Sequence, residues 1–177
     1  MMKKIFEWLI AIIIALVLLF IVRTFLFIGY VVDGESMEPT FHDEDRLIVN
    51  KLVKNIGQID NGDVIVFHAN KEADFIKRVI GLPGDTVEMK NNKLYINGTQ
   101  VNERYLNNDI KTDDFSTRTI QGSKSDVIPN GEYLVLGDNR SNSRDSREIG
   151  FVHEQDIVGK VNLRYYPFNQ IDVNFDK

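Results

Sequence analysis

The hydrophobic residues of this chain follow two different patterns. Residues 8–22 (WLIAIIIALVLLFIV) form a continuous apolar run without charge, and residues 25–32 are again largely apolar. Because a helix needs roughly 20 mostly apolar residues to cross a bilayer, we expect a spanning helix over residues 5–27, with Arg23 reaching the outer interface. A buried core helix is the alternative, but uncharged runs of this length are rare in soluble domains.

The residues on either side of the apolar run decide between an anchor and a removable signal peptide. Lys3 and Lys4 would suit the positive segment of a signal peptide. Residues 23–27 (RTFLF), however, lack the small side chains that cleavage requires. We therefore expect an uncleaved, single-pass anchor over residues 1–28, followed by one extracytoplasmic domain, residues 29–177. The two lysines favour a cytoplasmic N-terminus.

Beyond the apolar run, hydrophobic and polar residues alternate in short segments separated by Gly, Asn, Asp and Pro, which is typical of a mainly β domain. The predicted strands are residues 45–52, 63–68, 75–80, 86–90, 93–96, 133–136 and 157–166. Residues 87–96 predict a hairpin, because Asn91 and Asn92 tolerate the positive φ that a two-residue turn needs. For the polar stretch 106–126 we expect an exposed, mobile excursion between strands.

Composition limits the classes of partner. The 177 residues have a formal net charge of −5, and the first 28 residues contribute +2, so the predicted domain carries −7. An acidic domain argues against nucleic acid and against a polybasic lipid-binding surface. The chain has no cysteine, which excludes disulfides and thiolate metal sites.

Ser36 is the first candidate for chemistry, in the segment 34–40 (GESMEPT). A serine hydroxyl is a poor nucleophile until a base removes its proton, and the usual base is histidine. His42, His68 and His153 show neither metal-ligand spacing nor a recognisable partner motif. We interpret each of them as a surface or strand-end residue.

Lysine is the other candidate base. Lys77 lies among Phe75, Ile76, Val79 and Ile80, an apolar setting that could lower its pKa from the free value of about 10.4 by desolvation. An ordinary edge-strand lysine is the alternative, because burial depends on what covers that face of the strand. The residues alone therefore indicate a membrane-anchored β domain with a Ser/Lys pair as a candidate site.

Four motifs follow the apolar run in a fixed order. They are residues 36–40 (SMEPT), 62–67 (GDVIVF), 77–85 (KRVIGLPGD) and 137–147 (GDNRSNSRDSR). In this order they resemble type I signal peptidase of the short Gram-positive type, and the resemblance covers essentially the whole chain. It implies an antiparallel β catalytic domain, a serine endopeptidase that cuts after small-x-small (Ala-x-Ala-like) sites, and no cofactor or metal.

The resemblance also implies roles for individual residues. Ser36 would attack the scissile carbonyl, Lys77 would act as general base, and Ser143 would hydrogen-bond and orient the lysine. Asp145 and Arg147 would form an ion pair that holds the shape of the site.

Other positions near these motifs receive a different interpretation. For Arg140 and Arg144 a solvated charged loop remains our interpretation. The backbone N–H of Ser36 can stabilise an oxyanion, whereas Gly34 stands where some family members carry a serine that supplies a second donor.

By resemblance, an extended signal peptide would pair with strand edges at residues 30–34 and 74–76. The substrate-binding candidates are Val32, Asp33, Met37, Leu47, Val66, Asp74 and Ile76. Ordinary core packing is the alternative for the apolar members of this set. A second set could touch the membrane surface or pack in the core: Phe41, Tyr165, Tyr166 and Phe168.

The implied partners are secretory preproteins and the lipid bilayer, and the secretion translocon is a further candidate. The implied location is the plasma membrane of a bacterium. Two rival functions are a self-cleaving Ser/Lys protein and an inactive homologue that serves as a membrane-tethered binding protein. The anchor argues against the first rival, and the presence of both Ser36 and Lys77 argues against the second.

Overall fold

The computed structural model describes residues 2–21, 26–53 and 59–175. The strands are β1 (Phe27–Val31), β2 (Arg46–Asn50), β3 (Val64–His68), β4 (Asp74–Gly81), β5 (Val87–Lys90), β6 (Lys93–Ile96), β7 (Thr99–Val101), β8 (Phe115–Ser116), β9 (Glu132–Leu136), β10 (Val152–His153) and β11 (Ile157–Tyr166). The helices are α1 (Met2–Ile21) and α3 (Ser146–Ile149), with short 3-10 turns η2 (Thr117–Thr119), η3 (Glu154–Asp156) and η4 (Phe168–Gln170). The domain is mainly β and antiparallel, as predicted.

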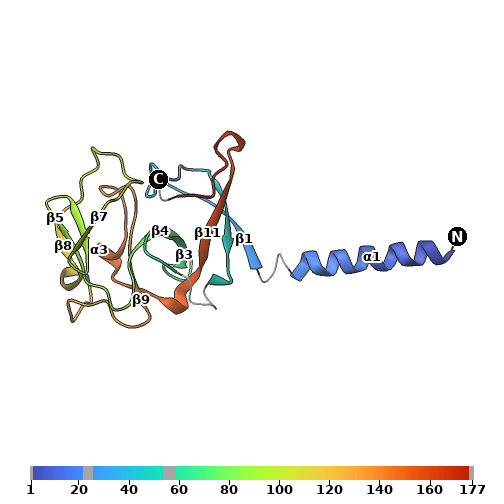
Figure 1. The fold of residues 1–177 in the computed structure, drawn as a ribbon, viewed down its shortest axis with the longest axis horizontal. Coiled ribbons are helices and arrows are strands. Elements are labelled where there is room, and N and C mark those ends of the chain that lie inside the picture. Colours follow the sequence, from blue (N-terminus) through green and yellow to red (C-terminus); the bar gives the residue numbers. More distant parts are fainter. Residues whose placement is uncertain (1, 22–25, 54–58, 176–177) are drawn as a thin grey trace.

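Helix α1 extends away from the β-rich part of the chain (Figure 1), and its side chains from Lys3 to Phe20 are exposed. The predicted helix over residues 5–27 is wrong at its C-terminal end, because Phe27 already pairs with Asn50 as the first residue of β1. Arg23 lies outside the described residues. In the described part of the chain no helix is both long and apolar enough to cross a membrane, so the predicted spanning helix is not confirmed.

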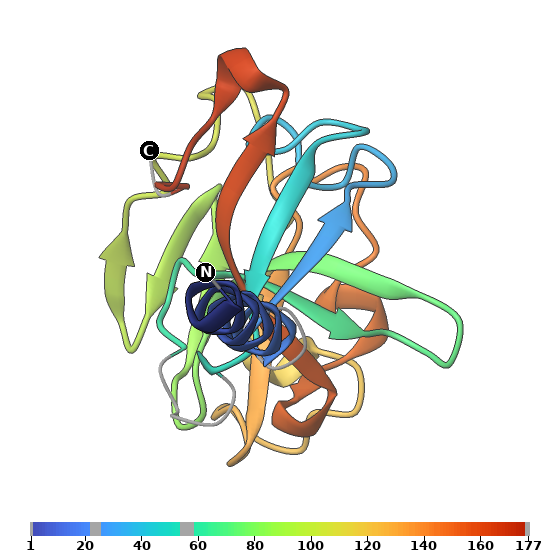
Figure 2. The same ribbon diagram turned by 90° about the vertical axis from the view of Figure 1, so that its right-hand side faces the viewer.

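The larger of two sheets has seven strands in the order β1-β2-β11-β3-β4-β9-β10. Strand β4 pairs with β3 from Asp74 to Arg78, but with β9 only from Arg78 to Gly81. The first half of β4 therefore has one edge available, and β1 is the outermost strand on the other side of the sheet. Figure 2 shows the sheet curled so that β1 ends close to the β3–β4 hairpin.

Strand β3 is buried on both faces, which places it at the centre of the larger sheet. Successive side chains of a strand point to opposite faces. Val64 and Val66 accordingly join one core cluster, whereas Ile65 and Phe67 join another. The continuous apolar run of this strand reflects that two-sided burial.

The smaller sheet has four strands in the order β7-β6-β5-β8 and lies at the end of the molecule opposite α1 (Figure 1). Its β5–β6 hairpin confirms the predicted turn, with φ of 51° at Asn91 and 59° at Asn92. A third core cluster joins this sheet to the larger one, since Met89 and Leu94 share it with Ile80 and Leu136.

The stretch 106–126 is exposed at most of its positions, as its polarity predicted, but it is not a plain excursion between strands. It contains β8, which pairs with β5, and the turn η2. Thr112, Thr117 and Ile120 are buried. Most of the residues between these three face solvent. The predicted mobility of the stretch stays a prediction.

The aromatic candidates for a membrane surface divide into two groups. Phe41 is fully buried in the cluster that contains Val64, so the surface interpretation is wrong for it. Phe168 is 75% exposed, and Tyr166 packs edge-on against it. Tyr165 is half-buried.

Candidate active site

Ser36 lies in a tight turn that follows β1. The turn is closed by hydrogen bonds from the Glu38 amide to the Glu35 carbonyl (3.1 Å) and from the Phe41 amide to the Met37 carbonyl (3.0 Å). Met37 and Phe41 are buried and anchor the turn in the core. Ser36, directly before the first of these anchors, is half-buried beside a cleft.

Lys77 projects from β4 toward this serine and is only 3% exposed. Its Nζ donates hydrogen bonds to Ser36 Oγ (2.7 Å) and to the Ile76 carbonyl (2.9 Å), and it lies 5.3 Å from the centre of the Phe75 ring. Burial lowers the pKa of Lys77 to about 8, against the opposing effect of the Asp145 and Asp138 charges. A lysine with this pKa is a usable base near neutral pH.

Ser143 is close to the pair but does not contact the lysine in the predicted way. Its Oγ is buried and has no hydrogen-bond partner among the described residues. A Cβ added at Gly137 would overlap both the Ser143 side chain and the Ser36 carbonyl, so the loop that carries Ser143 packs directly on the serine turn. The orienting role of Ser143 stays a prediction.

Asp145 and Arg147 form a bidentate ion pair, with Arg147 Nε and Nη2 each 2.8 Å from a carboxylate oxygen. Asp145 is fully buried, caps α3, and accepts a hydrogen bond from the Gly137 amide (3.0 Å). The pair therefore ties the two ends of the 137–147 loop together.

The cleft beside Ser36 has a volume of about 610 Å³. Its walls come from the end of β1 with residues 32–37 and from the start of β4, and Asn142 and Arg144 complete it. Tyr30 Oη donates to Asp74 Oδ2 (2.7 Å), a contact between the two walls, and His68 Nδ1 lies 2.6 Å from the other Asp74 oxygen.

The substrate-binding candidates do not all reach this cleft. Five of them line it: Val32, Asp33, Met37, Asp74 and Ile76. Leu47 and Val66 are fully buried in the core cluster beneath and do not line the cleft, so the core alternative applies to them.

Gly34 adopts φ of +92°, a conformation that favours glycine, and its amide donates to Asp43 Oδ1 (2.8 Å). A Cβ at this position would meet no atom within 4 Å. There is space for a larger residue, so the positive φ, and not a steric clash, is the reason that glycine is favoured here.

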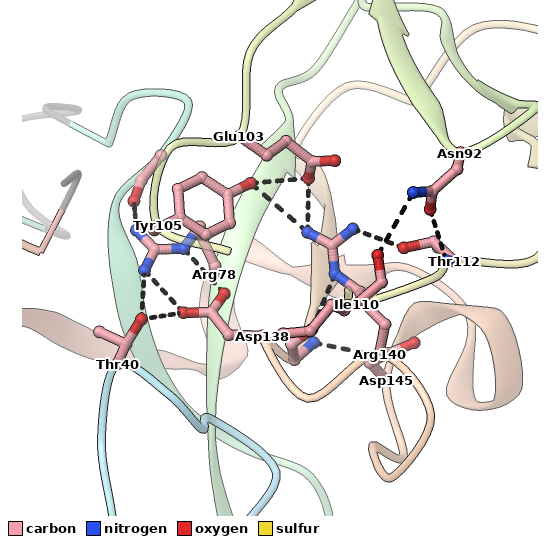
Figure 3. A network of polar contacts seen from close by, with 12 residues as sticks. Thr40, Arg78, Asn92, Glu103, Tyr105, Ile110, Thr112, Asp138, Arg140 and Asp145 are labelled. Carbon is pink, nitrogen blue, oxygen red and sulfur yellow. Dashed lines mark hydrogen bonds and ion pairs between the residues drawn. The ribbon is translucent and has the colours of Figure 1, made fainter. Parts of the chain in front are cut away.

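Arg78, the residue after Lys77, belongs to a buried network of polar contacts (Figure 3). Arg78 forms a fully buried ion pair with Asp138 (2.7 Å). Arg140 is 3% exposed and pairs with Glu103 (2.5 Å), so its interpretation as part of a solvated loop is wrong. Arg144 is exposed, in agreement with that interpretation.

Two members of this network, Glu103 and Tyr105, escaped the sequence analysis. They lie outside the four motifs, in a polar segment after β7. An acidic residue in a polar segment gives no sign that it will pair with a buried arginine 37 residues away. For these two residues the sequence offers no usable signal.

Residues 5–166 match the sequence model of the family described as "Signal peptidase, peptidase S26". Signal peptidase IB of Staphylococcus aureus (strain MRSA252) is 48% identical to this chain over 185 aligned positions, which cover 99% of this chain and 97% of that protein. Signal peptidase I P of Bacillus subtilis subsp. natto is 46% identical over 172 positions, covering 96% and 93%.

The crystal structure of a signal peptidase I from Enterococcus faecalis V583 is similar in fold, with a TM-score of 0.53 and 38% sequence identity. The match covers 58% of this chain and 96% of that one.

Proposed function

The chain belongs to the signal peptidase family, peptidase S26, and from this premise we propose that Ser36 and Lys77 are the catalytic pair with which it works. The protein is a signal peptidase I, a serine hydrolase that cleaves signal peptides. The observation that carries the proposal is the 2.7 Å contact between Ser36 Oγ and the Nζ of a lysine that is almost fully buried. The nearby His68 is exposed, and its Nδ1 contacts a carboxylate oxygen of Asp74.

The proposed reaction begins with neutral Lys77. Its Nζ accepts the Ser36 hydroxyl proton while Oγ attacks the scissile carbonyl carbon, and the Ser36 backbone N–H donates to the oxyanion that develops. The intermediate collapses as the C–N bond breaks, and Lys77 returns the proton to the leaving amine. Water, deprotonated by the same lysine, then hydrolyses the ester and releases Ser36.

Supporting residues keep this geometry. We assign the Asp145–Arg147 pair to holding the 137–147 loop, and the Ser143 hydroxyl to orienting Lys77 when substrate excludes water from the site. Gly34 supplies no side-chain donor, so we assign the second oxyanion contact to backbone or water.

Substrate binding uses β-addition in this proposal. A signal peptide would lie extended in the cleft between the end of β1 and the available edge of β4. Val32 and Ile76, on opposite walls, would accept small side chains at the −1 and −3 positions. The fully buried Leu47 and Val66 set how deep those subsites can be.

We also propose that α1 associates with lipid and brings the cleft to the membrane surface. Its apolar side chains, from Trp8 to Phe20, are exposed, so no other part of the described chain buries them. Burying that surface in lipid would be favourable. We further propose a plasma membrane location, an extracytoplasmic site and contact with the secretion translocon.

The test is cleavage of a preprotein with Ala at −3 and −1 in detergent. Wild type should cut once after −1, whereas Ser36→Ala and Lys77→Ala should be inactive while their circular dichroism stays unchanged. Tyr95→Phe, on β6 of the smaller sheet, is the matched control and should cut normally. Cleavage by Ser36→Ala would mean that a different nucleophile is used.

A further inference from the structure

The buried network connects three segments that carry or touch the catalytic pair (Figure 3). Arg78 follows Lys77 on β4, and its Nε and Nη2 donate to the two Asp138 oxygens (2.9 and 2.7 Å). Thr40, at the end of the turn that holds Ser36, donates to Asp138 Oδ2 (2.5 Å). The strand of the lysine and the turn of the serine are therefore joined through one carboxylate.

The loop after β9 contacts the nucleophile from the other side. The Asn139 amide donates to the Ser36 carbonyl (3.1 Å), and Asn139 Nδ2 donates to the Glu35 carbonyl (3.1 Å). The same loop begins at Gly137, where no side chain would fit against Ser36 and Ser143. A shift of this loop would thus be transmitted directly to the serine backbone.

The position of that loop depends on a segment that carries no catalytic residue. Arg140 donates to the Gly137 carbonyl within the loop (3.0 Å), and outward to Glu103 Oε1 (2.5 Å) and Thr112 Oγ1 (3.0 Å). Glu103 and Thr112 belong to the segment after β7, on the side of the smaller sheet. The guanidinium stays charged and is almost fully buried, so its place in the interior is favourable only while these partners pair with it.

Tyr105 joins the two halves of the network. Its ring lies 3.8 Å from the Arg78 guanidinium, and its hydroxyl donates to Glu103 Oε1 (2.8 Å). Burial raises the pKa of Tyr105, so the hydroxyl keeps the proton that it donates. One side chain therefore contacts the arginine beside Lys77 and the carboxylate that pairs with the loop arginine.

We propose that Glu103, Tyr105 and Arg140 are positioning residues for the Ser36–Lys77 pair, so that the segment from Glu103 to Thr112 is a part of the catalytic apparatus. The inference rests on the proposed function of Ser36 and Lys77. These residues act through Arg78 and through the 137–140 loop, without touching the substrate. Their effect should appear in the rate of the chemical step, because a misplacement of about 1 Å can cost on the order of 10²-fold in rate.

The experiment uses the full chain and a peptide with Ala at −3 and −1, at a temperature well below the unfolding midpoint of every variant. Glu103→Gln should lower kcat by roughly tenfold or more and leave KM within about twofold, since Glu103 hydrogen-bonds to no described residue that lines the cleft. Tyr105→Leu should do the same because the ring is lost. Tyr105→Phe keeps the ring on Arg78 and should recover most of the rate, to within about threefold of wild type.

Arg118→Gln is the matched control, because it removes an exposed ion pair with Asp126 in the same part of the chain. It should leave both kcat and KM unchanged.

A merely structural role predicts a different result. Glu103→Gln and Tyr105→Leu would then lower the unfolding temperature while kcat, measured where the variants are folded, stays at the wild-type value; that outcome overturns the proposal. A parallel increase in KM with constant kcat would also overturn it, by placing the effect on substrate binding. If wild type is inactive or Ser36→Ala cuts, the proposed catalytic pair fails instead, which is a distinguishable result.

Discussion

The two sheets of this protein differ in what they contribute to the site. The seven-stranded sheet supplies Lys77, borders the cleft with β1 and β4, and buries β3 on both faces. The four-stranded sheet buries one face only, as the alternation of β5 shows, and no residue of it lines the cleft. The segment between its strands β7 and β8 nevertheless supplies Glu103 and Tyr105 to the buried network.

The comparison separates two ways in which a residue can matter. A side chain of the smaller sheet can support stability through the third core cluster without reaching the site. Residues of the larger sheet would support both stability and, in the proposed mechanism, chemistry, since Lys77 and Arg78 are neighbours on β4. Substitutions in the two sheets should therefore differ in the ratio of lost rate to lost stability.

The largest effect on rate is expected at Lys77. Lys77→Met keeps most of the side-chain volume but removes the base, so kcat should fall by roughly 10²–10⁴-fold. The unfolding temperature should stay equal or rise, because a buried amine is replaced by an apolar group. Peptide cleavage measures kcat, and thermal unfolding measures the unfolding temperature. Retention of more than a tenth of the wild-type rate would show that another group acts as base.

The largest effect on stability is expected at Arg78. Arg78→Met leaves Asp138 buried without its bidentate partner, which should cost about 3–5 kcal/mol in the free energy of unfolding. The double variant Arg78→Met/Asp138→Leu should recover much of that stability without recovering activity, since the link to Thr40 is still lost. Urea unfolding tests this. A single variant as stable as wild type would contradict the assigned role of the ion pair.

A smaller effect, on stability alone, is expected in the smaller sheet. Met89 is 1% exposed in the third core cluster, and Met89→Ala should cost about 2–3 kcal/mol through the cavity that it leaves. Its kcat, measured where the variant is folded, should equal that of wild type. A tenfold loss of kcat would mean that the core of the smaller sheet is coupled to the site as tightly as the buried network is.

Much of the fold could be predicted from the sequence where the burial of a strand determines its pattern of hydrophobic and polar residues. The bounds of β6 and β11 match their predicted ranges, and the Asn91–Asn92 turn was identified from its chemistry. Strand β1 was missed because its residues continue the apolar run of α1, and hydropathy alone does not separate a strand from a helix there. The two-residue strands β8 and β10 are too short to show a period.

The candidate site could be predicted to the extent that its residues lie in the four motifs. Ser36 and Lys77, 41 residues apart in sequence, are brought together by the turn after β1 and by β4. Arg140 was misread because a charged loop normally faces solvent, and the sequence does not reveal that Glu103 and Thr112 close over it. Long-range pairing of buried charges depends on tertiary contacts, which no local pattern encodes.

The central claim is that a lysine with a lowered pKa serves as base, and the pH dependence of kcat/KM tests it most directly. Neutral Lys77 is the active form, so kcat/KM should rise about tenfold per pH unit on the acidic side and level off above a pKa of about 8. The low-pH limb reports the loss of the base by protonation of Nζ. A profile that is flat from about pH 6 to about pH 10 would contradict lysine as the general base.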